Sequence, residues 1–297
     1  MLSLLVPGGH GQLGRELAER GSDVRAPGSA ELDVTNAGAV VEAVKSLAES
    51  AEHPVVINAA AYNAVDAAET DGTRAFAVNG DGPRLLAAAC ATARVPLIHV
   101  STDYVFPGDG DRPYETTDPV RPRSAYGLTK AAGEDAVLGS GAQACVVRTA
   151  WVYGAYGKNF VKTMAALAAS HDTLSVVDDQ RGCPTWTGDL ATGLLELAER
   201  LVAGGPPKER LLHCAGGGET TWFAFARAVF EELGLDAERV SPCTTAEFPR
   251  PAPRPAYSVL SDRSWRDAGL TPMRPWRDAL AAAFAEHGEH FRAAAQR

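Results

Sequence analysis

A tyrosine and a lysine four residues apart are the two side chains of this sequence that are best suited to catalysis. Tyr126 and Lys130 have the spacing YxxxK, and residues four apart on a helix lie on one face. A positive charge beside a phenol lowers its pKa from the usual value of about 10, which would suit a proton donor to a ketone oxygen near neutral pH. Exposed helical pairs share this spacing, so we predict a catalytic pair only together with the next two features.

The second feature is a polar cluster behind an apolar run. Residues 96–100 read PLIHV, and Ser101, Thr102, Asp103 and Tyr104 follow them directly. In open α/β sheets, ligands bind at the carboxyl ends of the strands. We therefore expect Thr102 to hydrogen-bond a substrate carbonyl and to orient it towards a cofactor. His99, inside the apolar run, is expected to be a core histidine.

The third feature is a glycine loop at the start of the chain. Gly8, Gly11 and Gly14 form a GxxGxxG pattern between an apolar run at 2–6 and a helical pattern over 12–20. Glycines in this context permit a tight turn and let the backbone approach a pyrophosphate at the helix N-terminus. An ordinary turn is the alternative. The order of glycine loop, strand-end threonine and YxxxK predicts a reductase that uses a nicotinamide dinucleotide.

The choice between NADH and NADPH depends on the end of the second strand, expected at about 23–26. An acidic residue there would bind the ribose 2′-hydroxyl of NAD. Arg25 stands at that place instead and could pair with a 2′-phosphate. We expect NADPH or NADH to be used, with a slight preference for NADPH.

Alternating segments position these residues. Short apolar runs at 2–6, 55–58, 96–102 and 143–149 alternate with helical patterns in the first half of the chain. This alternation predicts an α/β fold of the Rossmann type, a doubly wound parallel sheet with helices on both faces.

After residue 150 the rhythm changes. We expect a NAD(P)-binding domain over residues 1–150, joined again by a return segment at about 187–215. Residues 151–297 should form mainly a smaller C-terminal α/β substrate lobe. The proline-rich segment 248–258 suits neither a helix nor a central strand, and a last helix is expected at about 276–287.

Composition limits the partners and the compartment. The formal net charge of −9 argues against nucleic acid, which needs a basic surface. No stretch approaches the roughly 18 apolar residues of a membrane helix. The five cysteines show no metal-ligand spacing and form a poor disulfide framework. We expect a cytoplasmic protein, monomeric or homodimeric, that binds neither nucleic acid nor a membrane.

Seven stretches resemble the extended short-chain dehydrogenases/reductases, and within them the dTDP-4-dehydrorhamnose reductase family. They read GGHGQLG, INAAAYNAVDAAE, HVSTDYVFPG, YGLTKAAGE, VVRTAWVYG, VVDDQRGCPT and FPRPAPRPAYS, from residue 5 to about 260. The resemblance implies NAD(P)H-dependent reduction of the C4 ketone of dTDP-4-dehydro-β-L-rhamnose, a nucleotide sugar, with Tyr126 as proton donor.

The resemblance also implies the roles of the site residues. The implied catalytic residues are Thr102, Tyr126 and Lys130; the implied cofactor contacts are Gly8, Gly11, Gln12, Leu13, Gly14, Asp33, Val34, Ala61, Tyr62, Asn63 and Lys130; and the implied sugar contacts are Thr102, Asp103, Tyr126 and Trp151. Arg254, in the proline-rich segment, could reach a diphosphate or could be a surface arginine.

A metal is an open point. Some members of the family resembled hold Mg2+ through three glutamates at a dimer interface, and Glu16, Asp189 and Glu286 stand at the corresponding places. One glutamate is thus an aspartate, and single surface acids are usually solvated charges. We assign no metal ligand here and leave the presence of Mg2+ open.

Two other functions remain open. The chain could be a 4-ketoreductase for another dTDP-deoxysugar, which the motifs do not distinguish. It could also be a non-catalytic regulatory subunit on the same fold, although retention of Tyr126, Lys130 and Thr102 counts against that.

Overall fold

The computed structural model describes residues 1–294 and has a six-stranded parallel sheet at its centre. The strands follow the order β10-β5-β4-β3-β1-β2, and every neighbouring pair is parallel. Their bounds are β1 Leu2–Leu5, β2 Val24–Arg25, β3 His53–Asn58, β4 Leu97–Thr102, β5 Ala144–Thr149 and β10 Leu211–His213. The runs of valine, isoleucine and leucine in these strands suit a sheet that is buried on both faces.

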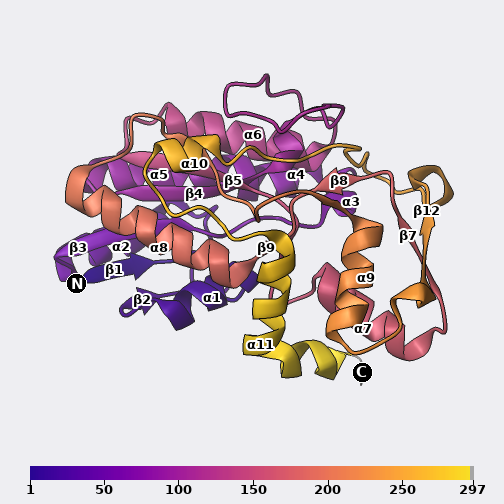
Figure 1. Cartoon of the computed structure of the whole chain (residues 1–297). Helices are drawn as coiled ribbons and strands as arrows, with labels where there is room; N and C mark the ends of the chain where they lie inside the picture. The colour runs from indigo at the N-terminus through magenta and orange to yellow at the C-terminus, as the bar shows by residue number, and fades with distance from the viewer. Residues whose placement is uncertain (295–297) are drawn as a thin grey trace.

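Helices cover both faces of the sheet (Figure 1). One face carries α1 (Gln12–Arg20), α8 (Thr187–Gly204) and α10 (Arg263–Asp267), and the other carries α2 (Ala37–Ser50), α5 (Gly82–Ala93) and α6 (Ala125–Leu138). The predicted fold class, a Rossmann-type doubly wound α/β sheet, is confirmed. Because all six strands run in the same direction, their carboxyl ends share one edge of the sheet, where ligands of such folds bind.

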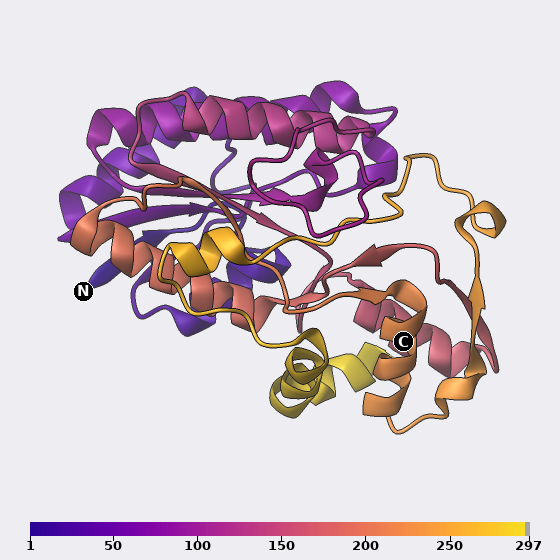
Figure 2. The same cartoon turned by 45° about the horizontal axis from the view of Figure 1, so that its top comes forward.

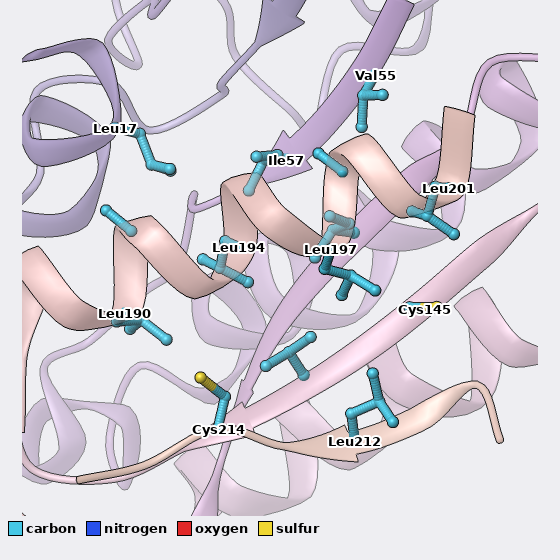
Figure 3. Packing of buried hydrophobic residues seen from close by; sticks show 14 of the residues in the cluster. Leu17, Val55, Ile57, Cys145, Leu190, Leu194, Leu197, Leu201, Leu212 and Cys214 are labelled. Carbon is cyan, nitrogen blue, oxygen red and sulfur yellow. The ribbon is translucent and has the colours of Figure 1, made fainter. Parts of the chain in front are cut away.

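The core between α8 and the sheet is made of leucines at helical spacing. Leu190, Leu194, Leu197 and Leu201 point from one side of α8 towards the strands, where they meet residues such as Ile57 (Figure 3). Burying a leucine side chain contributes about 1.5–3 kcal/mol, so this row holds α8 firmly on the sheet. The next element of the chain after α8 is β10, which forms the edge of the sheet beside β5.

The remaining elements gather beside the sheet (Figures 1 and 2). They are β6 (Val152–Tyr153), α7 (Phe160–Ser170), β7 (Leu174–Val177), β8 (Arg181–Gly182), β9 (Thr185–Trp186), β11 (Thr220–Thr221), α9 (Trp222–Glu232), β12 (Val240–Cys243) and α11 (Trp276–Ala294). Helices α7, α9 and α11 share an aromatic core that includes Phe225, Phe230 and Phe291. The last helix extends beyond the predicted end at residue 287, although His287 itself has non-helical angles (φ −127°, ψ 22°).

The other elements are short: three lie between β3 and α5, one follows β4, and two flank β12. They are α3 (Val65–Ala68), α4 (Gly72–Phe76), the π-helical turn η1 (Ala77–Asp81), and the 3-10 turns η2 (Asp103–Val105), η3 (Ala237–Arg239) and η4 (Thr245–Glu247). The proline-rich segment 248–258 forms neither a helix nor a ladder strand, as predicted. Within the described residues, no helix combines the length and the apolar character needed to cross a bilayer.

Candidate active site

Three glycines of the loop, Gly8, Gly9 and Gly14, lie so close to neighbouring backbone atoms that a Cβ would not fit. Gly8 has φ +82°, and a Cβ on Gly9 would lie 2.0 Å from the Ala26 carbonyl oxygen. A Cβ on Gly14 would lie 2.4 Å from the Gly8 carbonyl oxygen. Gly11 is the N-cap of α1 and offers no side chain to the first-turn N–H groups, so these can bind an anion. This cradle fits the pyrophosphate of a dinucleotide.

Tyr126 and Thr102 come together at the carboxyl edge of β4. Tyr126 lies in the first turn of α6, whose N-cap Ser124 accepts a hydrogen bond from the Gly127 N–H. Its ring meets the edge of the Tyr104 ring at a centroid distance of 5.6 Å, and its hydroxyl faces Asn63 Oδ1 at 3.5 Å. The phenol is 8% exposed, so it is held in place by packing.

Lys130 lies one turn further along α6 and is 2% exposed. Its Nζ donates a hydrogen bond of 2.7 Å to the Val100 carbonyl oxygen in β4. Burial lowers the pKa of this ammonium to about 8, against the opposing effect of Glu134. Lys130 is therefore a cation at neutral pH that is fixed to the strand carrying Thr102.

The expected lowering of the Tyr126 pKa is wrong for this arrangement. Burial raises the pKa of the phenol, the charge of Asp103 raises it further, and a hydrogen bond with Thr102 lowers it in part. Desolvation of the phenolate outweighs the attraction expected from Lys130, whose Nζ is bonded to Val100. The phenol therefore keeps its proton at neutral pH, which is the state that a proton donor requires.

Asp103 is a buried carboxyl beside Thr102. The Thr102 hydroxyl donates a hydrogen bond of 2.9 Å to Asp103 Oδ1, and the Tyr104 N–H donates to Thr102 Oγ1 at 3.2 Å. Burial raises the pKa of Asp103 to about 6. Asp103 thus fixes the direction of the Thr102 hydroxyl and is half-protonated at a mildly acidic pH.

Asn79 links the loop after β3 to helix α6. Its amide accepts a hydrogen bond from the Tyr62 N–H at 2.8 Å and donates to Thr129 Oγ1 at 3.1 Å. Asn79 lies in the π-helical turn η1, and such turns occur frequently at functional sites. The two hydrogen bonds of Asn79 hold Ala61, Tyr62 and Asn63 opposite α6. Single-sequence patterns do not predict such a turn.

A cavity of about 550 Å³ lies at the end of β2, beside the glycine loop. Arg25, His10 and Glu31 line it, and the His10 ring lies 3.4 Å from the Glu31 carboxylate. Asp33, nearby in the chain, accepts hydrogen bonds from the backbone and the side chain of Thr35, which lower its pKa. Val34 and Leu13 are buried in the core, so only their backbone could meet a ligand.

Trp151 follows β5 in an unusual conformation. It has φ +49°, which is uncommon for a residue with a side chain and costs roughly 1–3 kcal/mol. Its indole stacks on that of Trp222 from α9, at a centroid distance of 3.5 Å and an angle of 6°. The stack joins the end of β5 to helix α9.

The model of the RmlD substrate binding domain family matches residues 2–288. The chain belongs to this family. The predicted resemblance is therefore confirmed, and it extends over nearly the whole sequence.

Relatives in the RmlD family have names that describe related reactions. A dTDP-4-dehydrorhamnose reductase of Mycobacterium tuberculosis is 50% identical over 95% of this chain and 92% of its own length. A probable dTDP-4,6-dihydroxy-2-methyloxan-3-one 4-ketoreductase of Streptomyces antibioticus is 48% identical over 98% of this chain and 99% of its own. The solved dTDP-4-dehydrorhamnose reductase of Bacillus anthracis, in complex with NADP, superposes with a TM-score of 0.89 at 34% identity, over 96% of this chain and 99% of its own.

The three acids considered as metal ligands by resemblance to this family do not come together. Glu16 and Glu286 approach each other and His287, but Asp189 pairs with Arg274 at 2.9 Å. The Arg20 guanidinium bonds Glu16 at 2.8 Å and Glu286 at 2.6 Å. Within this single chain, Arg20 thus supplies the positive charge between Glu16 and Glu286.

Arg254 has a partner within the chain. Its Nη2 donates to Asp66 Oδ2 at 2.9 Å, and the same carboxylate accepts a hydrogen bond from the Ala252 N–H at 3.2 Å. These bonds tie the proline-rich segment to α3. The Arg254 side chain is partly buried and paired with a carboxylate. It is therefore not a free surface arginine, which was one of the two alternatives for it.

Proposed function

We propose that this chain reduces the C4 ketone of dTDP-4-dehydro-β-L-rhamnose to dTDP-β-L-rhamnose with NADPH or NADH. The observation that carries this proposal is the meeting of Tyr126 and Thr102 at the carboxyl end of β4, with Lys130 fixed to the same strand. The name of the M. tuberculosis relative supports the choice of sugar.

Each of the three residues has one role in this proposal. On substrate binding, the Thr102 hydroxyl turns its one proton from Asp103 Oδ1 to the ketone oxygen. The neutral Tyr126 phenol hydrogen-bonds the same oxygen and donates its proton to it as charge develops there. Lys130 remains cationic and holds the nicotinamide ribose hydroxyls. The bound dinucleotide supplies the hydride that reduces C4.

The cradle of Gly8, Gly11 and Gly14 would hold the pyrophosphate, with the backbone N–H groups of Gln12 and Leu13 in the first turn of α1. Asp33 and Val34 would lie beside the adenine, and Ala61, Tyr62 and Asn63 beside the nearer ribose. In the cavity at the end of β2, Arg25 suits a 2′-phosphate and Glu31 suits a 2′-hydroxyl. We propose that both cofactors bind, with NADPH preferred through Arg25.

On the substrate side, we propose that Asp103 and Trp151 contact the deoxysugar. The strained backbone of Trp151 supports this role, because strain of this kind gathers at ligand sites. The lobe formed mainly by residues 151–297, of which 151–294 are described, would bind the nucleotide sugar, while residues 1–150 and 187–215 would bind the cofactor. The five unpaired thiols support a cytoplasmic location, and we propose a monomer or homodimer.

A second candidate differs only in the sugar. The S. antibioticus relative is named for another dTDP-linked ketone and is almost as similar. Turnover of NADPH and NADH on a panel of dTDP-4-keto-6-deoxy sugars separates the two. Fastest turnover of dTDP-4-dehydrorhamnose supports the proposal, and preference for another ketosugar supports the second candidate. Cofactor binding without turnover of any of them would favour a regulatory subunit.

A further inference from the structure

The segment between β6 and α7, residues 154–159, lies against helix α1. Asn159 Nδ2 donates a hydrogen bond of 3.0 Å to Gln12 Oε1. Gly157 has φ +65°, and a Cβ there would lie 2.9 Å from Gln12 Cγ. The segment therefore packs closely on the first residue of α1, at the end of the helix that adjoins the glycine loop.

Tyr156 fastens the same segment further along α1. The Arg15 guanidinium lies over its ring, 5.4 Å from the centroid, and its hydroxyl donates a hydrogen bond to the Glu19 carboxylate. That hydrogen bond, together with burial and the charge of Glu19, raises the pKa of the phenol to about 12. Residues 12, 15 and 19 are spaced at three and four, so they share one face of α1. We call residues 154–159 the clasp.

Asn159 connects the clasp both to α7 and to α1. Its Oδ1 accepts a hydrogen bond from the Lys162 N–H at 3.1 Å, which caps the N-terminus of α7. Its Nδ2 donates to the Gly154 carbonyl oxygen at 2.8 Å in addition to Gln12. The Asn159 amide is thus fixed by its own segment. Its hydrogen bond to Gln12 is the contact that Asn159 itself makes with α1.

We propose that Asn159 is a positioning residue for the dinucleotide. It holds the Gln12 side chain and so stiffens the first turn of α1, whose N–H groups would hold the pyrophosphate. Binding of the cofactor is then coupled to the segment that begins α7. The inference rests on the proposed function only in so far as a nicotinamide dinucleotide occupies the glycine cradle.

A double-mutant cycle with Asn159→Ser and Gln12→Met tests the proposal. Serine keeps an N-cap acceptor for α7 but is too short to reach Gln12, and methionine removes the amide while leaving its backbone N–H. The control is Thr163→Ala, since this exposed hydroxyl bonds the Asn159 carbonyl oxygen in the same helical turn without contacting Gln12. The measurement is the Kd of NADPH by fluorescence titration, with the thermal midpoint of each variant.

We expect each single variant to raise the Kd about threefold to tenfold, the range of one neutral hydrogen bond. The double variant should be no weaker than the weaker single one, because both changes remove the same contact. The control should bind like the wild type. Wild-type affinity in Asn159→Ser, or fold-changes that simply multiply in the double variant, would overturn the role of Asn159 while cofactor binding stands. A wild-type protein that binds no dinucleotide would overturn the proposed function itself.

Discussion

The hydroxyl of Thr102 donates a 2.9 Å hydrogen bond to the carboxylate of the adjacent Asp103, which is 2% exposed. The threonine is therefore oriented by a group that is costly to keep charged in the fold. This pair connects the position of the hydroxyl that we propose to be catalytic to the stability of the protein.

Replacing Asp103 by asparagine should stabilise the protein at neutral pH and impair it as an enzyme. The pKa of Asp103 is raised from 3.8 to about 6, so the folded state binds this proton more tightly than the unfolded chain. The stability due to this group is therefore present below pH 4 and is lost as the pH rises towards and above 6. A pKa difference of about 2 corresponds to about 3 kcal/mol, so we expect a gain of about 1–3 kcal/mol in the free energy of unfolding at pH 7.5.

Urea unfolding at pH 7.5 and at pH 4 measures this gain, which should vanish at the lower pH. We expect kcat/KM to fall about tenfold in the same variant, the loss typical of one hydrogen bond to a charged group. Asp135→Asn, on the exposed side of α6, is the control and should change neither quantity. Equal destabilisation of Asp103→Asn at both pH values would contradict the argument.

The affinity for NADPH should weaken as the pH rises through about 8. Burial lowers the pKa of Lys130 to about 8, so above that pH the side chain loses the charge proposed to hold the ribose. The KM for NADPH should be constant from pH 6.5 to 7.5 and rise several-fold by pH 9. In Lys130→Met the KM should be high throughout, without this pH dependence. A variant that keeps the wild-type pH profile would show that another group titrates.

Replacing a loop glycine by alanine should weaken NADPH binding more strongly where the added Cβ has less space. A Cβ on Gly9 would meet the Ala26 carbonyl oxygen at 2.0 Å, one on Gly11 would meet the Gly8 carbonyl oxygen at 3.2 Å, and one on Gly72 would meet nothing within 4 Å. We expect more than a tenfold loss of NADPH affinity in Gly9→Ala, a smaller loss in Gly11→Ala and none in Gly72→Ala. Circular dichroism checks that each variant is folded, and a Gly11→Ala variant weaker than a folded Gly9→Ala would contradict this order.

Arg25 should distinguish the two cofactors. It lines the cavity at the end of β2 with Glu31, and loss of a hydrogen bond to a charged group costs about 1.5–3 kcal/mol. Arg25→Ala should raise the KM for NADPH about tenfold or more and leave that for NADH unchanged. Arg84→Ala, at an exposed ion pair in α5, is the control. A parallel rise for both cofactors would mean that Arg25 does not meet a 2′-phosphate.

Much of the nucleotide-binding fold could be predicted because its signals are local. The glycine loop, the apolar runs of β1, β3, β4 and β5 and the YxxxK spacing each depend on neighbouring residues. The same local reasoning placed Thr102 at a strand end, and β4 indeed ends at that residue.

What could not be predicted depends on contacts between distant segments. The raised pKa of Tyr126 follows from burial of the phenol and from the charge of Asp103. The YxxxK spacing indicates neither of these. Asn79 reaches Thr129 through a π-turn, and Arg20 reaches Glu286 across 266 positions of the chain. The stack of Trp151 on Trp222 likewise joins two lobes whose packing no local pattern describes.

The most direct test of the account is turnover of dTDP-4-dehydrorhamnose by Tyr126→Phe, followed through NADPH absorbance. Tyr153→Phe is the control, because that buried hydroxyl has no hydrogen-bond partner among the described residues. We expect kcat to fall about 10²–10⁴-fold in Tyr126→Phe, the contribution of a general acid, with an unchanged Kd for NADPH and a wild-type rate in the control. Wild-type turnover by Tyr126→Phe would contradict the assignment of Tyr126 as the proton donor.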